Sequence, residues 1–83
     1  MFFQKIPELS YKEIETGLKK LGFQLQPKKS TGHEQWIADN PNRKVTVSKH
    51  LAPFGKRLVS LMAKQAGLDV KEFCRYCKDK NYL

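Results

Sequence analysis

Apolar residues recur with two different periods along this chain, and the period predicts where helices and strands lie. The first helical pattern covers residues 11–21. Ser10 and Glu13 have the spacing of a capping box at its start, and Gly22 is a typical helix stop. The apolar positions that share one face of this predicted helix are Tyr11, Ile14, Leu18 and Leu21.

Two more helical patterns lie in the second half of the chain. One spans residues 56–66 and stops at Gly67, and a last short helix follows Asp69, which together with Glu72 repeats the capping-box spacing. In the longer helix, four residues are expected to lie on one side: Leu58, Leu61, Met62 and Gln65. The short helix is expected to dock onto the domain through Phe73, Cys74 and Cys77.

Between the first two helices the period changes to two, which is typical of half-buried strands. Phe23 and Leu25 alternate with glutamines, residues 34–38 form a second run, and residues 44–48 form a third with its valines on one face. The polar residues 39–42 form a strong turn signal between the last two runs. The pattern therefore predicts a short antiparallel meander.

This order of elements, α-β-β-β-α with an extra C-terminal helix, predicts an α+β fold. Both main helices can cover one face of a three-stranded antiparallel sheet, which makes a two-layer sandwich. A length of 83 residues fits one domain, residues 1–83, and the hydrophobic fraction of 40% supports a small core. We find no internal repeat, linker or low-complexity segment.

The charge of the chain favours a polyanionic partner. The formal net charge is +8, from 16 Lys and Arg against 8 Asp and Glu, which suits nucleic acid first, an acidic protein second and an anionic membrane third. A solvated surface with surplus lysine is the alternative. The basic residues cluster beside the loops that flank the predicted strands: Lys28, Lys29, Arg43, Lys44, Lys49, Lys56 and Arg57.

The sequence shows no targeting signal, and its two cysteines do not indicate a metal or redox site. No apolar run approaches the roughly 20 residues of a membrane span, and the N-terminus lacks a secretory signal, so a cytoplasmic protein is expected. Cys74 and Cys77 form a C-x-x-C on the last helix. We interpret them as reduced helix residues, because structural zinc usually takes four ligands and a redox pair would need a βαβ context. No metal site is expected.

One histidine stands where chemistry is plausible. His33 follows Gly32 at the start of the second predicted strand, with Lys28 and Lys29 just upstream. An imidazole gives or takes a proton near neutral pH, and the lysines suit a phosphodiester. The alternative is a hydrogen-bonded histidine at a strand start that has no catalytic role. Trp36 is expected to anchor the core rather than to stack on RNA bases.

Several short elements over residues 10–73 resemble, in order and spacing, the HicA family of toxin–antitoxin ribonucleases. They are Leu21-Gly22-Phe23, Gly32-His33 with Trp36, Val45-Thr46-Val47-Ser48-Lys49-His50, and Lys64-Gln65-Ala66-Gly67-Leu68-Asp69. The chain departs from the family in three places. Thr31-Gly32-His33 replaces the usual Gly-Ser-His, Ser48 stands where proline is common, and residues 51–55 lack the usual proline-glycine-rich form.

The resemblance implies a fold like that of double-stranded-RNA-binding domains. It also implies the toxin of a type II toxin–antitoxin system: a metal-independent RNA endonuclease, or mRNA interferase, that cleaves mRNA and arrests translation and growth. The implied partners are mRNA and a HicB-like antitoxin, with no cofactor. The family's catalytic histidine maps onto His33, and cleavage would proceed by attack of the ribose 2′-hydroxyl on the adjacent phosphate.

The other basic residues are expected to contact RNA: Lys28, Lys29, Arg43, Lys44, Lys49, His50, Lys56 and Arg57. His50 is favoured as a structural residue or phosphate contact over a general acid, because the resemblance places it outside the usual catalytic assignment. Lys56 and Arg57 start a helix, where backbone N–H groups favour anions, and a merely solvated helix start is the open alternative.

Two other functions remain compatible with the same residues. One is a non-catalytic RNA-binding domain that uses the basic face, and the other is a basic protein-interaction module with an acidic partner. For a toxin, the antitoxin is expected to cover His33 and the neighbouring basic loops, residues 28–37 and 49–57.

Overall fold

A computed structural model describes residues 6–27, 33–39 and 42–78. The helices and strands follow the predicted order: α1 (Tyr11–Lys20), β1 (Gln24–Leu25), β2 (His33–Ala38), β3 (Arg43–Ser48), the 3₁₀ turn η1 (Lys49–Leu51), α2 (Lys56–Ala66) and α3 (Val70–Lys78). This confirms the predicted α+β fold of the kind found in double-stranded-RNA-binding domains.

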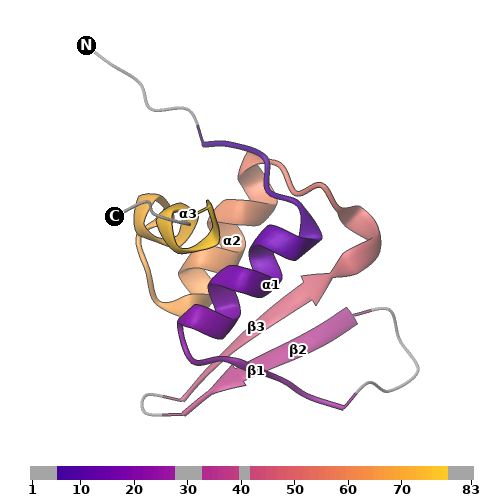
Figure 1. Ribbon diagram of the computed structural model, residues 1–83, viewed down its shortest axis with the longest axis vertical. Helices are drawn as coiled ribbons and strands as arrows, with labels where there is room; N and C mark the ends of the chain where they lie inside the picture. The colour runs from indigo at the N-terminus through magenta and orange to yellow at the C-terminus, as the bar shows by residue number, and fades with distance from the viewer. Residues whose placement is uncertain (1–5, 28–32, 40–41, 79–83) are drawn as a thin grey trace.

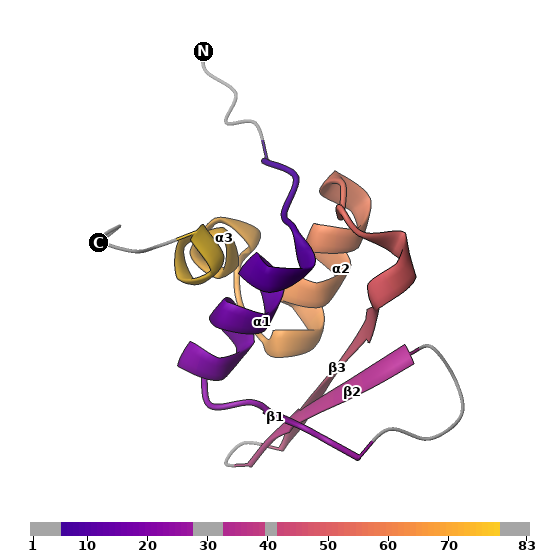
Figure 2. The ribbon, with the colours of Figure 1, turned by 45° about the vertical axis from the view of Figure 1, so that its right-hand side comes forward.

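The three strands form one antiparallel sheet in the order β1-β2-β3. The helices lie together on one face of the sheet (Figure 1), and the view turned by 45° shows the same two layers (Figure 2). In the β2–β3 pair, His33 lies opposite Ser48 at one end and Ala38 opposite Arg43 at the other. This register places the start of β2 beside the chain that leaves β3 for η1.

The capping box predicted for α1 forms, whereas at α3 Asp69 caps the helix through a bond to Lys71 and not to Glu72. The Glu13 N–H donates to Ser10 Oγ at 3.1 Å, and the Ser10 N–H donates to Glu13 Oε1 at 2.9 Å, which completes the capping box of α1. Asp69 Oδ2 accepts from the Lys71 N–H at the start of α3. Gly67 ends α2 with φ at 82°, a left-handed conformation that glycine adopts without strain.

The core lies between the sheet and the helices. Trp36 is only 1% exposed, which confirms its predicted role as a core anchor. Val45 and Val47 face the same side of the sheet and are fully buried. Residues from the helices and the connections complete this core: Leu9, Ile14, Leu18, Phe54, Val59, Met62, Ala63 and Phe73.

Two predicted faces differ from the structure. The first strand is only two residues long, and Leu25 is 46% exposed because β1 is an outer strand of the sheet. In α2, the four residues expected on one side do share a side, but this side is not the most buried one, because Leu61 is 49% exposed. The residues that α2 buries are Val59, Met62, Ala63 and Ala66.

The cysteines lie where α3 crosses α1. Cys74 and Cys77 are free thiols, and both are buried. Burial raises the pKa of the Cys74 thiol, and burial, with the neighbouring Cys74 and Glu13, raises the pKa of Cys77 to about 12. A buried thiol that stays protonated is a poor nucleophile and metal ligand, so these residues act as packing groups. No helix in the described part of the chain is long and apolar enough to span a membrane.

Candidate functional site

The sheet register brings two histidines together at one edge of the molecule. His33 is the first residue of β2 and pairs with Ser48, the last residue of β3. The chain then turns through η1, whose middle residue is His50. The two imidazole rings are nearly parallel, at 8°, with their centroids 6.1 Å apart. Both residues are exposed to solvent.

The residue before His50 is a lysine whose side chain contacts α1. Lys49, the first residue of η1, lies with its Nζ 4.6 Å from the centroid of the Tyr11 ring at the start of α1. A cation over an aromatic face is attracted by the ring quadrupole. Tyr11 thereby restrains an ammonium group that belongs to the residue just before His50.

A buried carboxylate fixes the start of β2. Glu34, the residue after His33, is only 9% exposed. The Tyr11 hydroxyl donates to both of its oxygens, at 2.7 and 3.0 Å, and Trp36 Nε1 donates to Oε1 at 3.1 Å. Burial, with the hydrogen bond and negative charge of Glu34, raises the pKa of Tyr11. Tyr11 therefore remains a neutral donor that ties β2 to α1.

The predicted basic residues do not all gather at this site. Lys49 and His50 lie beside His33, but Arg43 and Lys44 lie at the other end of β3, about 16 Å away at strand spacing. The Arg43 guanidinium lies against Gly67 at the C-terminal end of α2, where a cation is favoured by the helix dipole. This placement suits a structural role for Arg43.

Lys56 and Arg57 lie exposed on the first turn of α2. The N-cap, Gly55, has no side chain to accept from the first-turn N–H groups, so this helix end retains donors for an anion. The predicted contacts Lys28 and Lys29, together with Gly32, lie outside the described residues.

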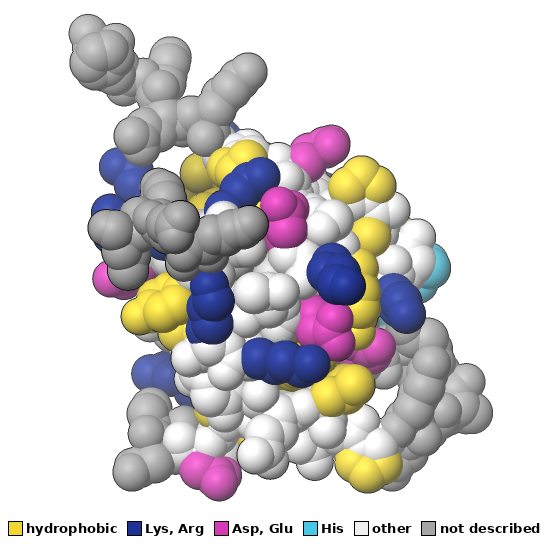
Figure 3. Space-filling view, viewed as in Figure 1, with side chains coloured by type: hydrophobic (Ala, Val, Ile, Leu, Met, Phe, Trp, Pro, Cys, Tyr) yellow, Lys and Arg dark blue, Asp and Glu magenta, His cyan; other side chains and the backbone are white. Residues whose placement is uncertain are grey.

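The surface around the site is mixed in charge. Over α1, acidic and basic side chains lie next to one another (Figure 3), and histidine surface is visible at the right-hand edge of this view. Among the residues that the structure describes, no group of three or more His, Cys, Asp or Glu side chains is placed to hold a metal ion. Two imidazoles are the titratable groups that the structure brings together at this edge.

Sequence reasoning missed the contribution of Glu34 and Tyr11 to the site. The signal was present, because Glu34 and Trp36 share one face of a strand by the two-residue period, and a carboxylate on a buried face needs partners. Sequence reasoning also kept His33 and His50 in separate roles, since their proximity depends on strand register.

Comparison with known proteins identifies the family. A family model described as the HicA toxin of bacterial toxin–antitoxin systems matches residues 11–68, which include both histidines, Glu34 and Lys49. Searches among curated proteins and among solved structures gave no match. The match covers more than half of the chain, and the chain therefore belongs to the HicA family of bacterial toxins.

Proposed function

We propose that this toxin is a metal-independent endoribonuclease that cleaves mRNA in the cytoplasm and so arrests translation and growth. The observation that carries the proposal is the parallel pair of His33 and His50, with ring centroids 6.1 Å apart at an exposed edge. Cleavage of RNA by its own 2′-hydroxyl needs a base and an acid near the same phosphate, and two imidazoles supply both.

The proposed reaction is a transfer within the RNA chain. One imidazole takes the proton of the 2′-hydroxyl while that oxygen attacks the adjacent phosphorus. The bond from phosphorus to the 5′-oxygen of the next nucleotide breaks, and this oxygen takes a proton from the other imidazole. The products are a 2′,3′-cyclic phosphate and a 5′-hydroxyl. The attacking and leaving oxygens lie on opposite sides of the phosphorus, so the reaction needs two acid–base groups that reach the same phosphate.

Lys49 is proposed as the cation that stabilises the developing charge on the phosphate oxygens. Its ammonium is held over the Tyr11 ring, and its residue immediately precedes His50. A restrained cation costs less reorganisation during the reaction than a mobile one. Lys28, Lys29, Lys56 and Arg57 are proposed to bind flanking phosphates, and Arg43 and Lys44 are too distant for the same nucleotide.

Purified His33→Ala and His50→Ala variants test the proposal. Each is expected to lose cleavage of a short RNA by about 100-fold or more, the usual size of a general acid or base contribution, while RNA affinity stays within about threefold of wild type. Addition of EDTA is expected to leave the wild-type rate unchanged. Induced expression of wild type, but of neither variant, is expected to arrest growth.

A substrate with an activated leaving group separates the two roles. Uridine 3′-(4-nitrophenyl phosphate) needs little help from an acid, because nitrophenolate leaves without a proton. The variant that lacks the acid is expected to cleave this substrate nearly as fast as wild type, and the variant that lacks the base is not. Full cleavage of RNA by His50→Ala would remove His50 from the reaction. Binding of RNA by wild type without any cleavage would show a non-catalytic RNA-binding domain instead.

The antitoxin partner is proposed to be a HicB-like protein that covers the histidine pair. Membership of a toxin–antitoxin family implies an antitoxin, and both histidines are exposed to contact. Amide hydrogen exchange with and without the antitoxin is expected to show protection within residues 33–37 and 49–57. Full inhibition without protection there would place the antitoxin at a distant site.

A further inference from the structure

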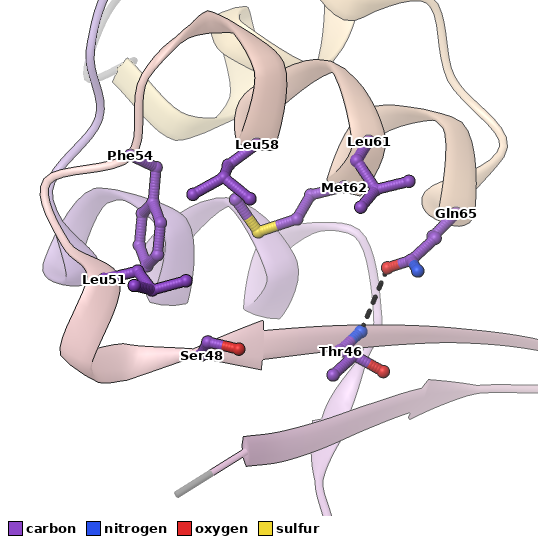
Figure 4. A pocket seen from close by; sticks show the side chains of 8 residues that line it. All are labelled: Thr46, Ser48, Leu51, Phe54, Leu58, Leu61, Met62 and Gln65. Carbon is purple, nitrogen blue, oxygen red and sulfur yellow. Dashed lines mark hydrogen bonds between the residues drawn. The ribbon is translucent and has the colours of Figure 1, made fainter.

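An apolar groove lies between the outer edge of β3 and one side of α2 (Figure 4). Its volume is about 200 Å³, which is below the roughly 300–1,000 Å³ of small-molecule sites and suits a single large side chain. Leu51 and Leu61 border it and are 46% and 49% exposed. The side of α2 that lines the groove is the apolar side expected from the sequence pattern: Leu58, Leu61, Met62 and Gln65.

The strand beside this groove has an unpaired edge. β2 occupies one edge of β3, and within residues 6–27, 33–39 and 42–78 no strand pairs with the other. The Thr46 N–H on that outer edge donates to Gln65 Oε1 at 3.1 Å, the bond drawn in Figure 4. Because antiparallel pairing alternates, Lys44 and Ser48 also direct their backbone groups outward. Such an edge is a template for another strand, and here a rotatable side chain covers its central donor.

The charge around the groove has one sign. Residues 40–68, which include β3, η1 and α2, contain six Lys or Arg residues and no Asp or Glu. Helical spacing places Arg57 and Lys64 beside Leu61 on α2, and Lys44 precedes Thr46 on the edge. The two elements that border the groove therefore both carry basic residues and no acidic ones.

We propose that this groove binds an extended, acidic segment of a partner protein, whose backbone pairs with the outer edge of β3. One large apolar side chain of the segment enters the groove, and its acidic residues meet the basic rim. Strand addition supplies affinity through main-chain hydrogen bonds and specificity through alternate side chains. RNA fits these features less well, because it has neither a backbone that extends a sheet nor an aliphatic side chain. The proposal does not depend on ribonuclease activity.

Selection of displayed random peptides that bind the full-length protein tests the proposal. A library of random twelve-residue peptides is selected for binding, and one enriched peptide is then synthesised for measurement of its Kd by fluorescence anisotropy. We expect the enriched peptides to be acidic, with large apolar residues at alternate positions. Enrichment of no peptides, or of peptides without acidic residues, would overturn the proposal.

Two variants that make the same substitution, leucine to aspartate, locate the binding site. Leu61→Asp is expected to weaken binding of the synthetic peptide by about tenfold or more, as for a central apolar contact. Leu25→Asp is the matched control, because Leu25 is 46% exposed on the opposite outer strand, β1. Its Kd is expected to stay within about twofold of wild type. Equal effects of both variants would overturn the proposed location.

Changes in the peptide test strand pairing without altering the protein. N-methylation of the peptide amides that face β3 is expected to abolish binding, whereas N-methylation of the alternate amides is not. Slower hydrogen exchange is expected at the Lys44 and Ser48 amides in the complex. If Leu61→Asp instead weakens RNA binding and leaves peptide binding unchanged, the groove is a nucleic-acid contact and the proposal is wrong.

Discussion

Glu34 is a buried side chain whose hydrogen bonds hold the residues around the exposed histidine pair. It lies under the sheet edge that carries His33, and it joins the hydroxyl of Tyr11 to the indole N–H of Trp36. Tyr11 in turn holds Lys49 through its ring. One buried carboxylate thus connects the strand that bears His33 with the cation beside His50.

We expect Glu34→Ala to lower the free energy of unfolding by about 2–4 kcal/mol, because two buried donors lose their acceptor. Glu34→Gln keeps one carbonyl acceptor in nearly the same place and is expected to cost less. Urea unfolding of both variants measures the difference. An equal loss for alanine and glutamine would show that the two hydrogen bonds contribute nothing to stability.

A second carboxylate makes stability depend on pH. Burial alone would raise the pKa of Glu13, but the hydrogen bonds from the Ser10 N–H and the Lys78 ammonium outweigh it, so the pKa is lowered from its ordinary value of 4.5. A carboxyl with a lowered pKa in the folded state stabilises the protein above its ordinary pKa. This stabilisation is lost as the pH falls through the pKa of the folded state.

We expect Glu13→Gln to be less stable than wild type at neutral pH by about 0.2–1 kcal/mol, the range for exposed ion pairs. Glutamine also completes a capping box. The loss of stability therefore measures the contribution of the negative charge and not that of the helix cap. The difference between the two proteins is expected to shrink as the pH is lowered below 4.5. Urea unfolding from pH 7 to pH 3 measures it, and a difference that stays constant would contradict the assignment.

At the scale of elements, α1 and α3 approach each other closely. A Cβ built on Gly17 would overlap Cys77 Sγ and would lie 3.0 Å from the Cys77 Cα. Glycine at this point of α1 is therefore required by packing, although glycine inside a helix weakens it by about 1 kcal/mol. The neighbour that requires glycine here is α3.

We expect Gly17→Ala to lower the free energy of unfolding by about 1–3 kcal/mol, since overpacking exceeds the gain in helix propensity. Thr16→Ala is the matched control, because Thr16 is exposed one residue earlier in the same helix. Its effect is expected to be neutral or slightly stabilising. Adding Cys77→Ala to Gly17→Ala is expected to recover part of the loss in thermal unfolding. A Gly17→Ala protein as stable as wild type would contradict the close contact.

Local signals account for what could be predicted at the scale of elements. Capping residues, glycine stops and the change of period are properties of neighbouring residues, and they located the helices to within about a residue. The buried side of α2 was not predictable in the same way, because two overlapping apolar sides exist on that helix. Small residues such as Ala63 allow close packing, and Leu61 was left outside.

Tertiary register accounts for what could not be predicted about the site. His33 and His50 belong to different segments, and they meet only because His33 pairs with Ser48 and η1 turns the chain back at that point. A shift of one residue in this pairing would turn the His33 side chain to the other face of the sheet. The sequence identified both histidines as candidates but contained no local signal for their proximity.

At the scale of the whole molecule, two basic residues of the same strand region are expected to behave differently. Lys49→Gln is expected to weaken RNA binding and to reduce the slope of log affinity against log salt by about 0.7, the value for one phosphate contact. Arg43→Gln is expected to leave that slope unchanged and to lower stability by about 0.3–1 kcal/mol, because its guanidinium lies at the end of α2. Fluorescence anisotropy over a salt series and thermal unfolding separate the two effects. The reverse pattern would place the RNA at the far end of β3.

The lack of acidic residues between positions 40 and 68 has a further consequence for encounters in solution. This stretch supplies six of the eight net positive charges of the chain, so β3, η1 and α2 carry most of its excess positive charge. A diffusing polyanion is turned by this field to meet the β3–α2 side before any contact forms. RNA and an acidic protein would then arrive by the same route, and whichever is more abundant would delay the arrival of the other.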